Sequence, residues 1–82
     1  MEQTDKYAYI TVTNKAFGDL DIMVSRDIPA KELIRNLYNA LGADKSSINA
    51  YYAKAERAKV LLTPTDTLRD KGIYDGDTLR IL

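Results

Sequence analysis

The chain has 82 residues, with 12 basic and 12 acidic side chains, a formal net charge of zero, and neither cysteine nor histidine. This length allows one small domain with a thin hydrophobic core. The missing residue types exclude disulfides, thiolate metal sites and histidine-based catalysis, and the balanced charge lacks the basic excess that is typical of nucleic-acid binding.

The first predicted element is a β-hairpin that follows a polar, flexible N-terminus over residues 1–5. Apolar residues alternate over Tyr7–Asn14 and again over Asp19–Ser25, which is the period of half-buried strands. Gly18 ends the short connection between them and can adopt the positive φ that a tight turn requires. We expect the core-facing residues of the hairpin to be Ala8, Ile10, Val12, Leu20, Ile22 and Val24.

An amphipathic helix is predicted from Pro29, in its first turn, to Gly42, which ends it. Ser25 or Asp27 is expected to cap its start. Tyr38 lies just beside the apolar stripe, at the expected seam between helix and sheet. The stripe that should pack against the sheet comprises Leu33, Ile34, Leu37, Ala40 and Leu41.

The segment Ile48–Glu56 is predicted to be a third strand because one set of residues, Tyr51, Ala53 and Ala55, alternates with another, Ala50, Tyr52 and Lys54. The five alanines between Ala43 and Ala58 also suit a helix. Residues 57–59 are interpreted as a solvated hairpin tip, followed by a short apolar strand, Val60–Leu62. Pro64 ends that strand because proline cannot donate to a ladder.

The last 15 residues predict a helical turn over Thr67–Lys71, a tight turn at Asp75–Asp77 and a final strand. Leu79 and Ile81 of this strand are expected to face the core. The sequence ends at Leu82, still within the strand, so we expect no flexible C-terminal tail.

This order of elements is the layout of the β-grasp, or ubiquitin-like, fold: an α+β fold with a mixed sheet of about five strands packed on one α-helix. The whole chain, residues 1–82, would be a single ubiquitin-like domain. Three motifs resemble the YukD/EsaB family of Gram-positive type VII secretion systems. They are the strand at residues 10–14 followed by that at 21–24, the Ile28-Pro29 pair leading to Leu33-Ile34, and the final Leu68-x-Asp70-x-x-Ile73-x-Asp75-Gly76-Asp77-x-Leu79-x-Ile81-Leu82.

The resemblance implies a cytoplasmic, non-catalytic accessory protein that works by binding other proteins. Its expected partner is the FtsK/SpoIIIE-type secretion ATPase or another membrane component of the machine, which could recruit it to the inner face of the membrane. No stretch approaches the about 20 apolar residues of a membrane span, so we expect no direct membrane insertion. No cofactor, metal or nucleic acid is implied.

The candidate partner-binding surface is the outer face of the sheet. In the β-grasp order the first strand lies between the second and the fifth, with the third beyond the fifth. Tyrosine, arginine and methionine are common at protein interfaces, although strands also favour tyrosine on any half-exposed face. The residues expected to share this surface are Tyr7, Tyr9, Met23, Tyr52, Lys54, Arg80 and Leu82.

Two other functions remain open at this point. A protein modifier or sulfur carrier would need a free Gly-Gly terminus, which this sequence lacks, whereas an adaptor of another complex would need no such signature. Aspartates in the last third could coordinate a hard cation, but aspartates in turns usually bind their own backbone. They are Asp66, Asp70, Asp75 and Asp77.

Overall fold

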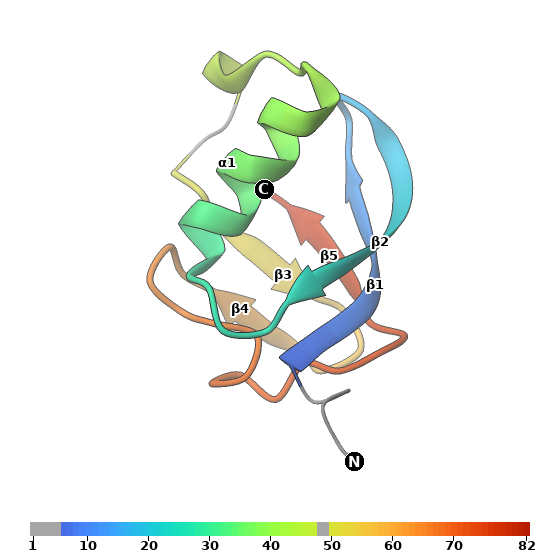
Figure 1. Cartoon of the computed structure of the whole chain (residues 1–82), viewed down its shortest axis with the longest axis vertical. Coiled ribbons are helices and arrows are strands. Elements are labelled where there is room, and N and C mark those ends of the chain that lie inside the picture. The colour runs from blue at the N-terminus through green and yellow to red at the C-terminus, as the bar shows by residue number, and fades with distance from the viewer. Residues whose placement is uncertain (1–5, 48–49) are drawn as a thin grey trace.

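Within residues 6–47 and 50–82, which the computed structural model describes, one α-helix packs against one face of a five-stranded mixed sheet (Figure 1). The sheet order is β2-β1-β5-β3-β4, with β1 and β5 parallel. This order confirms the predicted β-grasp fold; the predicted flexible segment 1–5 lies outside the described residues. The elements are β1 (Tyr7–Asn14), β2 (Gly18–Ser25), α1 (Ala30–Leu41), the 3₁₀-helix η2 (Lys45–Ser47), β3 (Ala53–Ala55), β4 (Val60–Leu62) and β5 (Thr78–Ile81).

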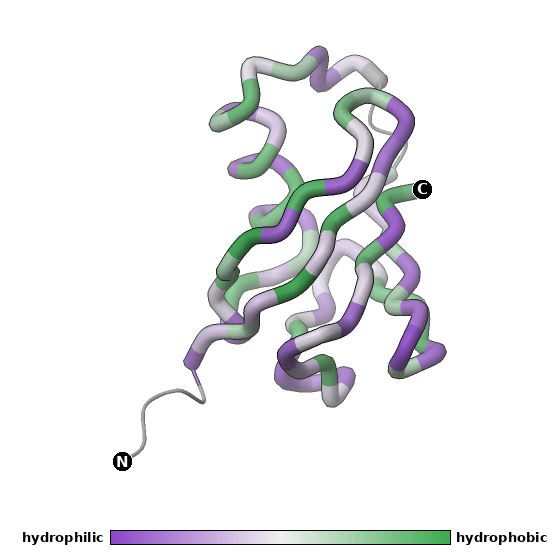
Figure 2. Tube along the Cα trace, turned by 90° about the vertical axis from the view of Figure 1, so that its right-hand side faces the viewer, coloured by the Kyte–Doolittle hydropathy of each residue, from purple (hydrophilic) through white to green (hydrophobic). Residues whose placement is uncertain are grey.

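The β1–β2 hairpin forms as predicted, with eight consecutive antiparallel pairs from Tyr7↔Ser25 to Asn14↔Gly18. Gly18 has a φ of 78°, the left-handed conformation expected at its position. Hydrophobic and hydrophilic residues alternate along both strands (Figure 2). The β1 side chains Ala8, Ile10 and Val12 are buried under α1, whereas those of β2 are only partly covered because β2 lies at the edge of the sheet.

The start of α1 is capped by backbone carbonyls of a distant loop. Pro29 is the N-cap residue and makes no side-chain capping bond. The N–H of Ala30 donates to the carbonyl of Asp66 (2.8 Å), and the N–H of Lys31 donates to that of Pro64 (2.9 Å). Two of the amides that a helix start leaves without intrahelical partners are thereby satisfied by tertiary contacts.

The prediction that Ser25 or Asp27 caps the helix is therefore wrong. The Ser25 hydroxyl accepts a hydrogen bond from the N–H of Asp27 (3.2 Å). The Asp27 carboxylate instead pairs with Arg69 at 2.6 Å, and this hydrogen-bonded ion pair lowers its pKa. Both side chains stabilise the loop before the helix and do not reach its free amides.

The buried stripe of α1 is shifted by comparison with the predicted one. Tyr38 is 1% exposed and is part of the core, where its ring meets Phe17 edge-on at 5.7 Å. Ala40 and Leu41, in the last turn of α1, are exposed. Gly42 ends the helix in the left-handed conformation, as predicted. Among the described residues, no helix is long and apolar enough to cross a bilayer.

The third strand is shorter than predicted and spans Ala53–Ala55. Ala50 and Tyr51 have positive φ values of 70° and 58°, so the chain turns there and cannot extend the ladder. The Tyr51 ring lies 5.6 Å from the guanidinium of Arg35, which attaches this turn to the helix. The predicted strand residues 48–49 lie outside the described part of the chain.

The buried carboxylate of Asp77 joins the β3–β4 turn to the start of β5. Asp77 is 3% exposed. It accepts hydrogen bonds from the N–H groups of Arg57 (2.7 Å), Ala58 (3.0 Å) and Thr78 (2.7 Å). Its own carbonyl accepts the N–H of Thr11 on β1 (3.0 Å). Three segments that are distant in sequence therefore meet at one residue.

We expect Asp77→Ala to lower the free energy of unfolding by about 2–3 kcal/mol, because it leaves partly buried amides without an acceptor. Asp75→Ala is the matched control: the exposed Asp75 accepts one N–H, from Tyr9 at 2.7 Å, and its loss should cost about 0.5–1.5 kcal/mol. Urea unfolding of both variants measures the difference. Equal losses would show that Asp77 has no special role.

The loop that caps α1 should be sensitive to acid. The backbone N–H and hydroxyl of Thr63 donate to the Asp66 carboxylate (both 2.9 Å) and lower its pKa. A lowered pKa in the folded state gives stability above the unfolded pKa of about 3.9, and this stability is lost as the pH falls through the folded value.

Asp66→Asn should therefore show a flatter decrease in stability between about pH 5 and pH 2 than the parent protein. Thermal unfolding as a function of pH measures this slope. Asp70→Asn is the control because it removes an acid outside the Thr63–Asp66 turn. The interpretation fails if both variants reduce the slope equally.

Candidate functional site

The outer face of the sheet, opposite α1, carries two groups of exposed side chains. The first group, called here the tyrosine end, comprises Tyr7, Tyr9 and Met23, which are 53%, 53% and 65% exposed. Tyr9 and Met23 are directly paired across β1 and β2. Two exposed tyrosines and a flexible methionine give this end a partly aromatic surface that can adapt to a partner.

The second group, called here the basic end, lies where β1, β5, β3 and β4 run side by side. The strand register places Arg80 next to Thr13 on one side and Lys54 on the other. Lys54 is in turn opposite Leu61, which is 47% exposed. Leu82, 49% exposed, follows Arg80 by two residues on the same side. The basic end therefore combines two cations with two exposed leucines: Lys54, Arg80, Leu61 and Leu82.

Polar pairs separate the two ends. The Thr11 hydroxyl donates to Asp21 and the Thr13 hydroxyl donates to Asp19, both at 2.6 Å. Thr11 and Tyr9 are two residues apart on β1, and Thr13 follows by two more, so the paired threonines and aspartates form a hydrophilic band across the hairpin. The face is thus two patches with a polar band between them, not one continuous aromatic surface.

The predicted residue Tyr52 contributes less than the other six. Its side chain is partly buried, and its carbonyl accepts the N–H of Leu82 (3.0 Å). Leu61 is not among the predicted surface residues, because Val60–Leu62 is uniformly apolar in sequence. The signal was present: with Leu62 buried (1% exposed), the two-residue period of a strand turns Leu61 to the opposite face.

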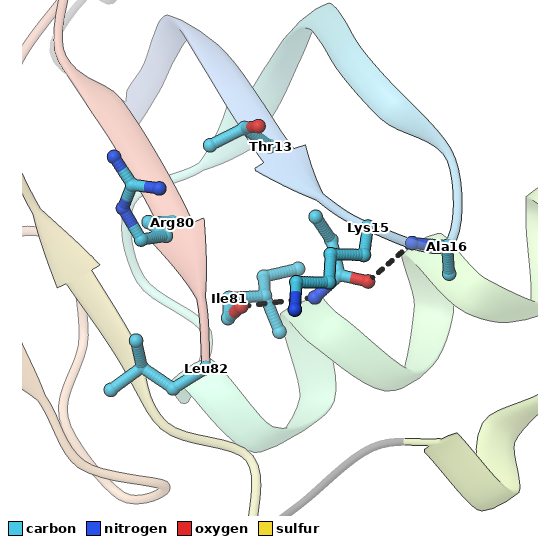
Figure 3. Close-up of a pocket in the computed structure, with 7 residues that line it drawn as sticks. Thr13, Lys15, Ala16, Arg80, Ile81 and Leu82 are labelled. Atoms are coloured by element: carbon cyan, nitrogen blue, oxygen red, sulfur yellow. Dashed lines mark hydrogen bonds between the residues drawn. The ribbon is translucent and has the colours of Figure 1, made fainter.

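An open pocket of about 720 Å³ adjoins the basic end, between the end of β1 and the end of β5 (Figure 3). Asn14 holds its two sides together: its side-chain amide donates to the carbonyl of Ile81 and accepts the N–H of Ala16, both at 2.9 Å. Lys15 and Arg80 line the pocket together with apolar atoms of Leu82. Such a lining suits a partner side chain that is acidic or apolar.

The electrostatics of the basic end are locally unfavourable. Lys54 and Arg80 are direct cross-strand neighbours of the same sign, an arrangement that destabilises a sheet. Arg80 is partly neutralised by Glu56, whose carboxylate is 2.7 Å from the guanidinium. An acidic group on a binding partner would offset the remaining repulsion between Lys54 and Arg80.

Three of the four C-terminal aspartates, Asp66, Asp75 and Asp77, accept hydrogen bonds from backbone N–H groups. Asp66 binds its own turn, as the capping interpretation predicts, while Asp75 and Asp77 accept amides from other segments. In the described part of the chain, no three His, Cys, Asp or Glu residues are grouped so that they could hold a metal ion. These carboxylates act as structural acceptors.

The arrangement of the described strands and helix defines a ubiquitin-like domain. The solution structure of the UBL domain of yeast Ddi1 is similar, with a TM-score of 0.57 and 22% identity over 98% of this chain and 92% of that chain. Identity at this level shows the fold alone. No curated protein sequence matches the chain.

The family is shown by a separate comparison. The family model described as "WXG100 protein secretion system (Wss), protein YukD" matches residues 7–81. The chain therefore belongs to the YukD family of ubiquitin-like proteins, which are associated with WXG100, or type VII, secretion.

Reversing one charge at the basic end tests the electrostatic argument. Lys54→Glu should raise the free energy of unfolding by about 0.2–1 kcal/mol, because it replaces a like-charge pair with Arg80 by an opposite-charge pair. Lys54→Gln should give an intermediate value, and salt should reduce both differences. Urea unfolding at low and high ionic strength measures them. Destabilisation by Lys54→Glu at low salt would contradict the argument.

Proposed function

We propose that this protein is a non-catalytic accessory of a type VII secretion system that acts by binding another protein through the outer face of its sheet. The observation that carries the proposal is the basic end. Lys54 and Arg80, two like charges, are direct neighbours there, and Leu61 and Leu82 are exposed to solvent. Both features are unfavourable in the free protein, and contact with a partner would offset them. The family membership supports the setting.

The tyrosine end would supply a second area of contact. Tyr7, Tyr9 and Met23 are exposed and large, the properties that interface anchors share. The polar band between the two ends would remain at the rim or contact the partner through water. Both ends on one face allow a partner to span β2, β1, β5 and β3.

We further propose that the partner is the FtsK/SpoIIIE-type secretion ATPase, or another membrane component of the machine, and that binding takes place in the cytoplasm at the inner face of the membrane. This choice rests on the family resemblance. An acidic, partly apolar segment of the partner is the chemistry that the basic end fits.

Covalent conjugation through the segment at Ile81 and Leu82 is not part of the proposed function. Ile81 is 4% exposed, and the N–H of Leu82 is bonded to the carbonyl of Tyr52. This segment belongs to the sheet, whereas an activating enzyme needs an extended glycine strand. Intact-mass measurement of the protein isolated from cells should give the unmodified mass; an adduct or a thiocarboxylate would instead support the modifier or sulfur-carrier alternative.

Charge reversal on the outer face should disrupt capture of the purified cytoplasmic region of the ATPase. We expect Tyr9→Glu and Lys54→Glu each to weaken binding at least about tenfold, because each adds repulsion or removes an anchor at one end. Asn36→Glu, on the exposed side of α1, is the matched control and should bind as the parent does. Titration calorimetry measures the affinity.

The thermal midpoints decide how a loss of binding is interpreted. Tyr9→Glu should unfold close to the parent temperature because its side chain is exposed, and Lys54→Glu should unfold at or slightly above it, as its predicted gain in stability requires. Unchanged affinity in both variants would refute the proposed surface. A loss confined to Lys54→Glu would restrict the surface to the basic end.

A further inference from the structure

The edge strand β2 is open along its whole length. Within the described residues, β2 pairs with β1 on one side and has no strand on the other. It is eight residues long and runs in unbroken register, without a bulge. Long, regular edges of this kind are templates for another strand.

The register shows which backbone groups are available. The N–H of Thr11 and the carbonyl of Tyr9 bond toward β5, to Asp77 and Gly76. In an antiparallel ladder, when the N–H and C=O groups of one residue point away from the partner strand, those of the residue paired with it point away as well. The N–H and C=O groups that face the free edge therefore belong to Asp19, Asp21, Met23 and Ser25.

The devices that usually protect such an edge are missing here. The β2 sequence GDLDIMVS contains no proline and no lysine. Its two charges, Asp19 and Asp21, are held by hydroxyls of Thr13 and Thr11, so that they lean toward β1 and away from the free edge. A strand that approached this edge would meet backbone groups before it met charge.

We propose that two copies of this protein pair through their β2 edges, antiparallel, about a two-fold axis at Ile22. The position of the axis follows from which acidic side chains would lie opposite each other. Centred on Asp21, the pairing would place Asp21 against its own copy; centred on Met23, it would place Asp19 against Asp27. Centred on Ile22, it places Asp21 opposite Met23 and Asp19 opposite Ser25, so no like charges are directly opposed.

The same register matches the core side of the strand. Leu20 would face Val24 of the second copy, and Ile22 would face Ile22 of the second copy. These three side chains are only partly buried in one chain, so pairing would cover them further. The sheets of the two copies would become one continuous sheet, with both outer faces on the same side. This inference does not depend on the proposed secretion partner.

A single cysteine tests the register directly, because the chain has none of its own. Ile22→Cys should form a covalent dimer on mild oxidation, since the two positions would be opposite each other in a non-hydrogen-bonded pair with Cα atoms about 4.5 Å apart. Val24→Cys is the matched control: its two copies would lie about 14 Å apart along the strands, too far for a disulfide. Equal cross-linking of both variants would overturn the register.

The unmodified protein provides an independent measurement. Its sedimentation mass should rise from 9.2 kDa toward twice that value as the concentration approaches about 1 mM. Met23→Pro removes an N–H that faces the free edge and should keep the protein monomeric, whereas Met23→Leu should dimerise as the parent does. A parent protein that stays at 9.2 kDa throughout, with no Ile22→Cys cross-link, would overturn the proposal.

Discussion

The structure depends on the hydrogen bonds by which Asp77 links three segments that are distant in sequence. A small domain has too little core to hold its strands in place by burial alone. The parallel pairing of β1 and β5 also joins opposite ends of the chain, so it carries a large loop-closure cost. The Asp77 carboxylate binds the amides of the β3–β4 turn, and its carbonyl binds β1, next to the first paired residue of β5. Together with the β1–β5 and β3–β5 ladders, these bonds hold β5 between β1 and β3.

A second set of tertiary contacts positions the helix. The carbonyls of Pro64 and Asp66 cap α1, and the Asp66 carboxylate holds the turn that presents them. Arg26, 2% exposed, donates to the carbonyl of Ile73, and its guanidinium lies 4.2 Å from the Tyr74 ring. The loop after β2 is thereby bound to the segment before β5. With both layers fixed, the sheet can expose a costly set of charges and apolar side chains on its outer face.

The sequence predicted those parts of the molecule that depend on local periodicity. The hairpin, the helix with Gly42 at its end and the inward Leu79 and Ile81 follow from alternation, amphipathicity and glycine conformation. The errors arose where a neighbour overrides local preference. Serine often caps helices, but here the first N–H groups of α1 donate to the backbone carbonyls of Pro64 and Asp66 and not to the Ser25 side chain. Tyr38 was predicted beside the buried stripe, at the seam between helix and sheet; its contact with Phe17 of the hairpin turn makes it part of the core. The left-handed turn at Ala50 and Tyr51 shortens a strand that alternation predicted to be longer.

For the candidate surface, the sequence by itself determined the outward residues of β1, β2 and β5, because side chains alternate along a strand whatever its neighbours are. Only the tertiary structure decided how those residues are grouped. Strand register brings Lys54 against Arg80 and adds Leu61 to them, while it places Tyr9 and Met23 beyond a polar band. Register is set by hydrogen bonds between segments that are far apart in the chain, such as the one between Asp75 and Tyr9, 66 residues apart. A local pattern contains no information on such pairings, and therefore none on the two-patch surface.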